Sequence, residues 1–155
     1  TFNAESLPFH DRVWLCYDLY ILGGWDGSQY LADDDQTIIG PDLWANYIDD
    51  NRLLVTTFSN QALFKQAFPS NYPDALNDLY TGSRTTGEFD GLQNFQDARY
   101  YRCTLLEHSQ LSMKALFMGL NLNEKEPERW AIDNVKISVF YNAAFDYVYM
   151  PVVQK

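Results

Sequence analysis

The feature that most constrains this chain is the run from Val13 to Leu22, which is apolar on both faces except at Asp18. Such a run forms a strand whose two faces are both covered, or largely so. Gly23-Gly24 and the Asp-Gly pair at 26–27 follow it, and both are typical turn formers. The sequence therefore predicts a central strand that ends in a tight turn.

Further strand-like runs follow along the chain, each bounded by turn-forming residues: 43–48, 52–58, 99–108, 111–122, 130–141 and 145–153. Asp49-Asp50-Asn51 separates the first two of these runs and predicts a hairpin. Roughly seven to nine strands, few helices and antiparallel hairpins predict an all-β fold, a two-sheet antiparallel jelly-roll sandwich. At 155 residues the chain is expected to form one module over 1–155.

The net charge of −10 excludes some classes of partner. Nucleic acids and anionic membrane surfaces are bound through basic patches, so neither is expected as a partner. No apolar run approaches the roughly 18 residues that span a bilayer, so no membrane insertion is expected. The chain opens at Thr1 without Met, and we expect a processed chain or an excised module.

Cys16 and Cys103 are the only cysteines, too few for a zinc cage. Each lies in a strand-like run. Two buried free thiols and a disulfide between strands both fit the sequence, because sequence separation does not set the distance between the two positions.

Asp133 lies within a predicted strand in an unexpected position. By the period-two rule it shares a face with apolar residues that a core would take, Ala131, Val135, Ile137 and Val139. A buried carboxylate must be paired, hydrogen-bonded, protonated or bound to a metal. Asp133 is therefore a calcium ligand, a hydrogen-bonded core group, or exposed because the strand has another register.

Carboxylates elsewhere make a calcium site plausible, because calcium takes six to eight oxygen ligands. If the first long strand is antiparallel to the last, Asp26 after the first comes near Glu128 before the last. Asp42, at the start of the next strand, reaches the same end. The predicted metal ligands are Asp26, Asp42, Glu128, Asp133 and Asp18. The alternatives are turn roles for Asp26 and Asp42, and a Tyr or Arg partner for Asp18.

Three stretches in order resemble a family of extracellular β-sandwich modules found in large secreted and surface proteins. They are "SLPFHDRVWLCYDLYILGGWDGS", "GPDLWANYIDDNRLLVTTFSN" and "PERWAIDNVKIS". The last strand is also similar to that of MAM domains and of some carbohydrate-binding modules. The resemblance runs from about Leu7 to Val139, and it departs at Gly23-Gly24 and at Arg129. It implies a jelly roll, an extracellular or cell-surface setting and a structural calcium ion.

Sequence motifs for catalysis are missing. His10 and His108, the only histidines, stand in no zinc pattern and are expected in turns or at the surface. A glycoside hydrolase needs two carboxyl groups across a cleft, which acidic composition alone does not indicate, so this class is less favoured. We expect no enzyme.

The sequence favours a recognition or adhesion module that binds a glycan or a surface partner. The alternative is a structural or assembly unit of a multidomain or filamentous surface protein, in which the C-terminal strand packs on a neighbouring module or copy. Aromatic side chains mark three candidate surfaces. These are the stripe Phe145, Tyr147 and Tyr149, the long loop 69–95, and Trp25 beside the first turn.

Overall fold

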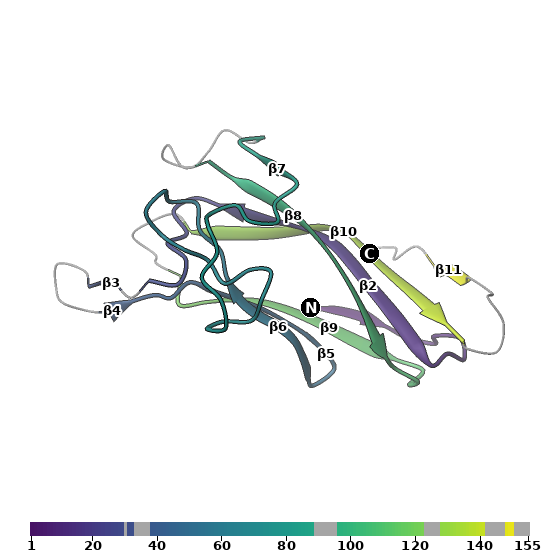
Figure 1. Ribbon diagram of the computed structural model, residues 1–155. Helices are drawn as coiled ribbons and strands as arrows, with labels where there is room; N and C mark the ends of the chain where they lie inside the picture. Colours follow the sequence, from purple (N-terminus) through teal and green to yellow (C-terminus); the bar gives the residue numbers. More distant parts are fainter. Residues whose placement is uncertain (30, 33–37, 89–95, 123–127, 142–147, 151–155) are drawn as a thin grey trace.

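Two β-sheets lie one above the other in the computed structural model of the chain (Figure 1). The structure describes residues 1–29, 31–32, 38–88, 96–122, 128–141 and 148–150. Every strand pairing in this part of the chain is antiparallel. The predicted stripe Phe145, Tyr147 and Tyr149 lies outside the side chains that the structure describes.

The first sheet has four strands, in the order β1 (Phe2–Ala4), β9 (Met113–Leu120), β5 (Leu43–Ile48) and β6 (Asn51–Thr57). The second has five, in the order β11 (Val148–Met150), β10 (Arg129–Phe140), β2 (Arg12–Leu22), β8 (Ala98–Glu107) and β7 (Thr85–Thr86). A separate ribbon pairs β3 (Leu31–Ala32) with β4 (Ile38–Ile39).

The chain crosses repeatedly between the two sheets, as it does in jelly rolls. It passes from β2 in the five-stranded sheet to the β5–β6 hairpin, then to β8, to β9 and back to β10. The predicted all-β sandwich is confirmed. Among the described residues there is no helix, and therefore none long and apolar enough to cross a membrane.

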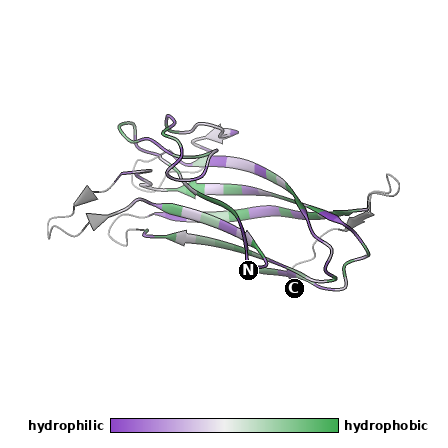
Figure 2. Cartoon of the chain, turned by 60° about the horizontal axis from the view of Figure 1, so that its bottom comes forward, coloured by the Kyte–Doolittle hydropathy of each residue, from purple (hydrophilic) through white to green (hydrophobic). Residues whose placement is uncertain are grey.

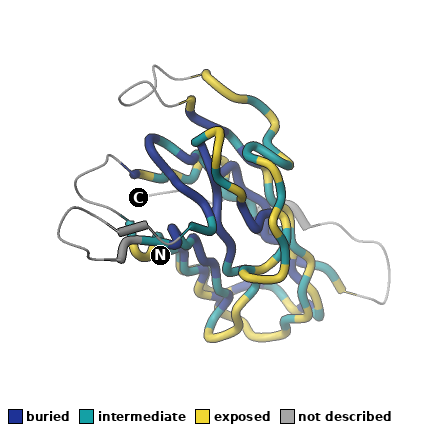
Figure 3. Tube along the Cα trace, turned by 60° about the vertical axis from the view of Figure 1, so that its left-hand side comes forward, coloured by how far each residue is buried: buried dark blue, intermediate teal, exposed yellow. Residues whose placement is uncertain are grey.

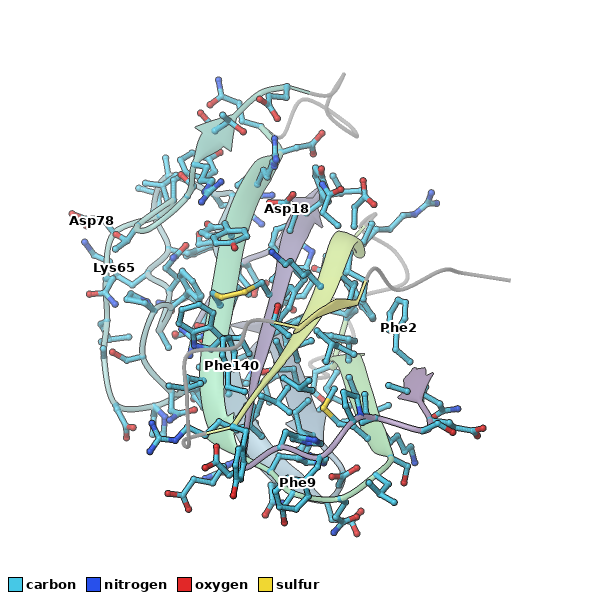
Figure 4. All side chains as sticks on the ribbon, turned by 90° about the vertical axis from the view of Figure 1, so that its right-hand side faces the viewer. Phe2, Phe9, Asp18, Lys65, Asp78 and Phe140 are labelled. Carbon is cyan, nitrogen blue, oxygen red and sulfur yellow. A yellow bond between two sulfur atoms is a disulfide. The ribbon has the colours of Figure 1, made fainter. Side chains whose placement is uncertain are left out.

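Strand β2 is central, since it pairs with β10 on one side and β8 on the other. Its odd-numbered residues from Val13 to Ile21 point into the core. Its even-numbered residues form the outer face of the sheet, where Cys16 lies opposite Cys103 of β8. The two form a disulfide, visible in Figure 4, so the alternative of free thiols is wrong. Because it links positions 87 residues apart, it stabilises the fold by on the order of 4 kcal/mol.

Aromatic rings fill the space between the sheets. The largest fully buried side chains include Trp25, Trp44, Tyr17, Tyr100 and Phe58. Buried residues lie along the centre of the molecule, and exposed residues lie around them (Figure 3). Apolar and polar residues alternate along several strands, as one-sided burial requires (Figure 2). Trp25 is fully buried, so the prediction that it forms a binding surface is wrong.

A β-bulge in β10 changes which of its residues face the core. The pairing with β2 shifts between Asp133 and Lys136, and Asn134 has a φ of 52°. Before the bulge Trp130 and Ile132 pack on the core, and after it Val135, Ile137 and Val139 do so. The extra residue reverses the alternation. Asp133 is therefore exposed, and the prediction of an inward carboxylate is wrong.

Candidate metal centre

Three of the five predicted ligands come together at one end of the sandwich. Asp26 follows the end of β2, Asp42 directly precedes β5, and Glu128 directly precedes β10. One carboxylate oxygen from each lies within 4.8 Å of the others. We call this group the carboxylate site. Since Asp42 belongs to one sheet and Glu128 to the other, the site spans both sheets at this end.

Antiparallel pairing explains why these residues meet. Leu22, at the end of β2, pairs with Arg129, at the start of β10. Asp26 then forms an isolated bridge with Ser59, just beyond the end of β6. Its backbone N–H donates a hydrogen bond to Asp42 Oδ2 at 2.8 Å. The turn after β2 thus crosses from the five-stranded sheet to the four-stranded sheet and carries Asp26 with it.

Hydrogen bonds hold that turn in place from several directions. The Trp25 indole N–H donates to the carbonyl of Arg129 at 2.9 Å, next to Glu128. The Asn60 amide donates to the carbonyls of Ile21 and Gly23, and its backbone N–H to that of Trp25. Side chains in such networks are fixed before any ligand arrives.

Two glycines let the backbone pass close to the site. Gly27 has a φ of 74°, and a Cβ there would lie 2.1 Å from the Lys65 carbonyl oxygen. Gly40 has a φ of 86°, and a Cβ there would lie 2.4 Å from the Gln29 carbonyl oxygen and 3.5 Å from Asp26 Oδ1. A side chain at either position meets both a strained φ and a backbone clash.

The carboxylate site is buried and strongly unfavourable for three negative charges. The exposed fractions of Asp26, Asp42 and Glu128 are 3%, 1% and 7%. Burial first, and then the charges of Asp26 and Glu128, together raise the pKa of Asp42 to about 9, although the hydrogen bond from the Asp26 N–H lowers it. Such a group becomes fully ionised at neutral pH only when a cation offsets the charge.

The residues present fit calcium among the common metals. All three donors are carboxylate oxygens, which calcium prefers, whereas zinc sites use nitrogen and sulfur. Calcium–oxygen distances of about 2.3–2.6 Å let two ligands of one ion lie up to about 5 Å apart. The mutual limit of 4.8 Å falls within that range. Three carboxylates provide up to six oxygens.

The structure does not bring Asp18 and Asp133, the other two predicted ligands, to this group. Asp18 points to the outer face of β2 (Figure 4), where its Oδ2 accepts hydrogen bonds from Arg99 at 3.1 Å and from Asn134 at 2.7 Å. Burial raises the pKa of Asp18, but these two bonds and the Arg99 charge outweigh it, and the net shift is downward. Exposed Asp133 accepts the backbone N–H of Asn134 at 2.7 Å.

The opposite end of the sandwich holds a polar chain that sequence reasoning missed. His10 Nδ1 lies 2.6 Å from the Pro8 carbonyl oxygen, and His10 Nε2 lies 2.7 Å from His108 Nδ1. His108 Nε2 in turn lies 3.2 Å from Asp49 Oδ2. We call this the histidine chain. His10 lies in the segment between β1 and β2, outside the strands, but it is buried rather than at the surface. No sequence spacing links two residues 98 positions apart.

A third polar group lies between the sheets. Several buried side-chain atoms have no hydrogen-bond partner among the described residues: Tyr17 Oη, Trp44 Nε1, both amide atoms of Asn46, Arg102 Nε and Thr104 Oγ1. We call them the inner polar group. A buried polar atom without a partner costs about 1–3 kcal/mol, so six approach the whole stability of a domain. The fold therefore requires that these atoms form hydrogen bonds with groups from outside the described chain, such as ordered water.

Comparison with known proteins identified no relative of this chain. No protein family model matches the chain, and neither a curated protein nor a solved structure gives a significant match. The fold is thus established by the structure alone. The resemblance to extracellular modules, MAM domains and carbohydrate-binding modules stays a prediction beyond the shared β-sandwich architecture.

Proposed function

We propose that the chain is a non-catalytic extracellular recognition module whose two sheets are joined at one end by a structural calcium ion. The observation that carries this proposal is the carboxylate site, in which Asp26, Asp42 and Glu128 converge from three chain segments. Convergence of buried acids from both sheets is costly without a cation, and a cation turns it into a link between the sheets.

The burial of the three acids favours a structural ion over catalysis. A glycoside hydrolase presents its two carboxyl groups to a sugar across a cleft. Here each of the three residues is less than a tenth exposed. The disulfide between Cys16 and Cys103 supports an extracellular setting, because disulfides persist mainly in oxidising compartments.

The surface that suits a recognition role lies at the other end of the five-stranded sheet. Phe9 and Tyr141 have ring centroids 4.8 Å apart, and Trp14 meets Phe140 at 5.1 Å. Phe9 is 71% exposed, Trp14 42% and Tyr141 47%. Phe9 and Phe140 are labelled in Figure 4. Exposed aromatic rings are suited to stacking on sugar rings or on apolar parts of a partner.

The same exposed aromatic surface supports a second function, a structural unit that packs against a neighbouring module or copy. A glycan array separates the two. Selective hits that disappear in Trp14→Ala support recognition. Concentration-dependent assembly without glycan hits, measured by analytical ultracentrifugation, supports the structural unit.

Thermal unfolding in EDTA, in calcium and in magnesium tests the ion. Calcium at about a hundred times its dissociation constant adds about 2.7 kcal/mol, a shift of several degrees. Asp42→Asn should remove the response, because a neutral amide is a weaker calcium ligand. Asp133→Asn is the matched control and should keep it. An equal shift with magnesium, or a full response in Asp42→Asn, argues against the site.

A further inference from the structure

The histidine chain links the two sheets at the end opposite the carboxylate site. His10 lies in the segment before β2 and His108 directly follows β8, whereas Asp49 lies in the β5–β6 turn. Strand β9 holds Asp49 in place, because Asp49 Oδ1 accepts the Lys114 backbone N–H at 2.9 Å and the Asp49 N–H donates to the Lys114 carbonyl at 2.7 Å. His10 is 1% exposed and the His108 side chain 5%, so water cannot readily replace the hydrogen bonds of their rings.

The two imidazole rings meet through their nitrogen atoms. Their planes differ by 8° and their centroids are 5.0 Å apart, while His10 Nε2 lies 2.7 Å from His108 Nδ1. Because the planes are nearly parallel, so short a contact leaves no room for face-to-face stacking. The two nitrogens therefore share a hydrogen bond, in which one donates and the other accepts.

The chain of contacts needs one proton more than its neutral histidines supply. The Pro8 carbonyl at one end and the Asp49 carboxylate at the other are acceptors only. Between them lie three contacts, of 2.6, 2.7 and 3.2 Å, and each requires one proton. A neutral imidazole carries one N–H, so two neutral histidines supply two protons for three contacts. A third proton makes the pair one imidazole and one imidazolium beside Asp49.

Without this third proton one contact must fail. Either His10 Nε2 and His108 Nδ1 face each other as two acceptors, or His108 Nε2 faces the Asp49 carboxylate as an acceptor. A buried acceptor that faces another acceptor is unfavourable. The proton belongs to the imidazoles rather than to Asp49, because an imidazole is the stronger base.

The charged groups on the surrounding elements favour the bound proton. Asp49 makes the direct contact, at 3.2 Å from His108 Nε2. The acids on the elements packed around the pair are Asp11, Asp49, Asp50 and Glu107. The cations on these elements are Arg12, Arg52 and Lys114, and all three are exposed. The nearest charges therefore offset an imidazolium more than they repel it.

We propose that His10 and His108 bind one shared proton, which completes the chain from Pro8 to Asp49 and makes this link between the sheets pH-dependent. With the proton bound, every contact has one donor and one acceptor. As pH rises the proton leaves, one contact is lost, and the segment that carries the exposed Phe9 is less firmly held. The inference goes beyond the proposed function and stands whether or not calcium or a glycan binds.

Asp49→Asn tests the proton count, because an amide supplies the missing donor in a side chain of the same shape. Its Oδ1 can still accept the Lys114 N–H, and its Nδ2 can donate to His108 Nε2. Two neutral histidines then satisfy all three contacts. Asp50→Asn removes a charge from the exposed next residue and is the matched control.

Urea unfolding of the full chain in calcium, between about pH 6 and about pH 8, measures the effect. Above about pH 6.5 unfolded histidines lose their protons. The folded parent then holds one proton more, so its unfolding equilibrium constant should rise with pH, by at most about tenfold per pH unit. Asp50→Asn should show the same rise, and Asp49→Asn should lack it. Asp42 is unchanged in all three proteins, so any pH dependence of the carboxylate site cancels in the comparison.

Nitrogen-15 nuclear magnetic resonance of the imidazoles locates the proton directly. In the parent at about pH 6, His10 Nδ1 and His108 Nε2 should both carry a proton, and the pair should release a single proton as one unit when pH rises. In Asp49→Asn at the same pH, His108 Nε2 should carry none.

Three results would overturn the inference. The first is a parent in which both histidines are neutral at about pH 6, a measurement that does not depend on any variant folding. The second is an equal rise of the unfolding constant with pH in the parent and in Asp49→Asn. The third is a proton found on the Asp49 carboxyl group, which carbon-13 shifts would reveal. A missing calcium response or an empty glycan array would count against the proposed function and leave this result unaffected.

Discussion

At the histidine end of the sandwich the two sheets are joined by groups that satisfy one another, whereas at the carboxylate end they are joined by groups that repel. His10, His108 and Asp49 form a continuous series of contacts of 2.7 and 3.2 Å, from the segment before β2, the end of β8 and the β5–β6 turn. Asp26, Asp42 and Glu128 offer only acceptor side chains. The first end contains both donors and acceptors, and the second needs a cation or a proton to offset its acceptors.

The difference teaches which contacts fold the protein and which respond to conditions. Donor and acceptor pairs at the histidine end do not depend on calcium. The stability contributed at the carboxylate end depends on calcium and on pH, because the group that neutralises it comes from solution.

The largest expected effect comes from breaking the histidine chain. His108→Leu leaves the buried His10 Nε2 without its partner and removes the contact to the part-exposed Asp49 carboxylate. We expect a loss of about 2–4 kcal/mol in the free energy of unfolding, measured with urea. The loss should be equal in EDTA and in calcium, and the exposed neighbour Leu111→Ala should change little. A loss confined to calcium would contradict the separation of the two ends.

The second effect is a pH dependence that belongs to the carboxylate end. The folded pKa of Asp42 is about 9, and that of an unfolded Asp is about 4. Between these values the folded state holds one proton more, so stability falls as pH rises. The slope is at most about 1.4 kcal/mol per pH unit, or about 3 kcal/mol between about pH 6 and 8 in EDTA.

Calcium should reduce this slope, because the ion replaces the proton at Asp42. The Asp42→Asn variant should not show this pH dependence of the carboxylate end in EDTA. Urea unfolding at both pH values measures each case. A flat profile of the parent protein in EDTA would show that the three acids do not repel as strongly as their burial implies.

A smaller effect separates backbone strain from the geometry of the site. Gly40→Ala adds a Cβ 2.4 Å from a backbone oxygen at a φ of 86°. Gly87→Ala adds one at a φ of 69° with nothing within 4 Å. Strain alone costs about 1–3 kcal/mol, so Gly40→Ala should exceed Gly87→Ala by the cost of the clash. Only Gly40→Ala should also weaken calcium binding by calorimetry. Equal losses of stability in the two variants, with intact calcium binding in Gly40→Ala, would show that Gly40 does not shape the site.

The sequence predicted that Asp26, Asp42 and Glu128 would converge, because this prediction needed only strand order. Once the first long strand is antiparallel to the last, the residues after one and before the other must meet, and Asp26 and Glu128 do so. The β5–β6 hairpin, with Asp49 at its turn, was predicted from turn-forming residues between two strand-like runs. Both predictions depend on where strands end, and they hold even if a strand end is misplaced by one residue.

Predictions that depended on exact register failed or stayed open. The bulge at Asn134 adds one residue to β10, and a single extra residue moves Asp133 from the inner to the outer face. The disulfide required that Cys16 lie opposite Cys103, and the histidine chain required two distant segments to meet. Long-range register is set by packing of the whole core and is not encoded in local spacing.

The smallest expected effect tests that register directly. Asp133→Ala changes an exposed residue whose only described contact is with the next residue's N–H. We expect less than about 0.5 kcal/mol of change in the free energy of unfolding and an intact calcium response. An inward Asp133, which the undisturbed alternation of β10 predicted, would make this substitution one of the most damaging in the chain. Urea unfolding of this variant therefore decides between a bulged and a regular β10, and a loss above about 2 kcal/mol would favour the regular strand.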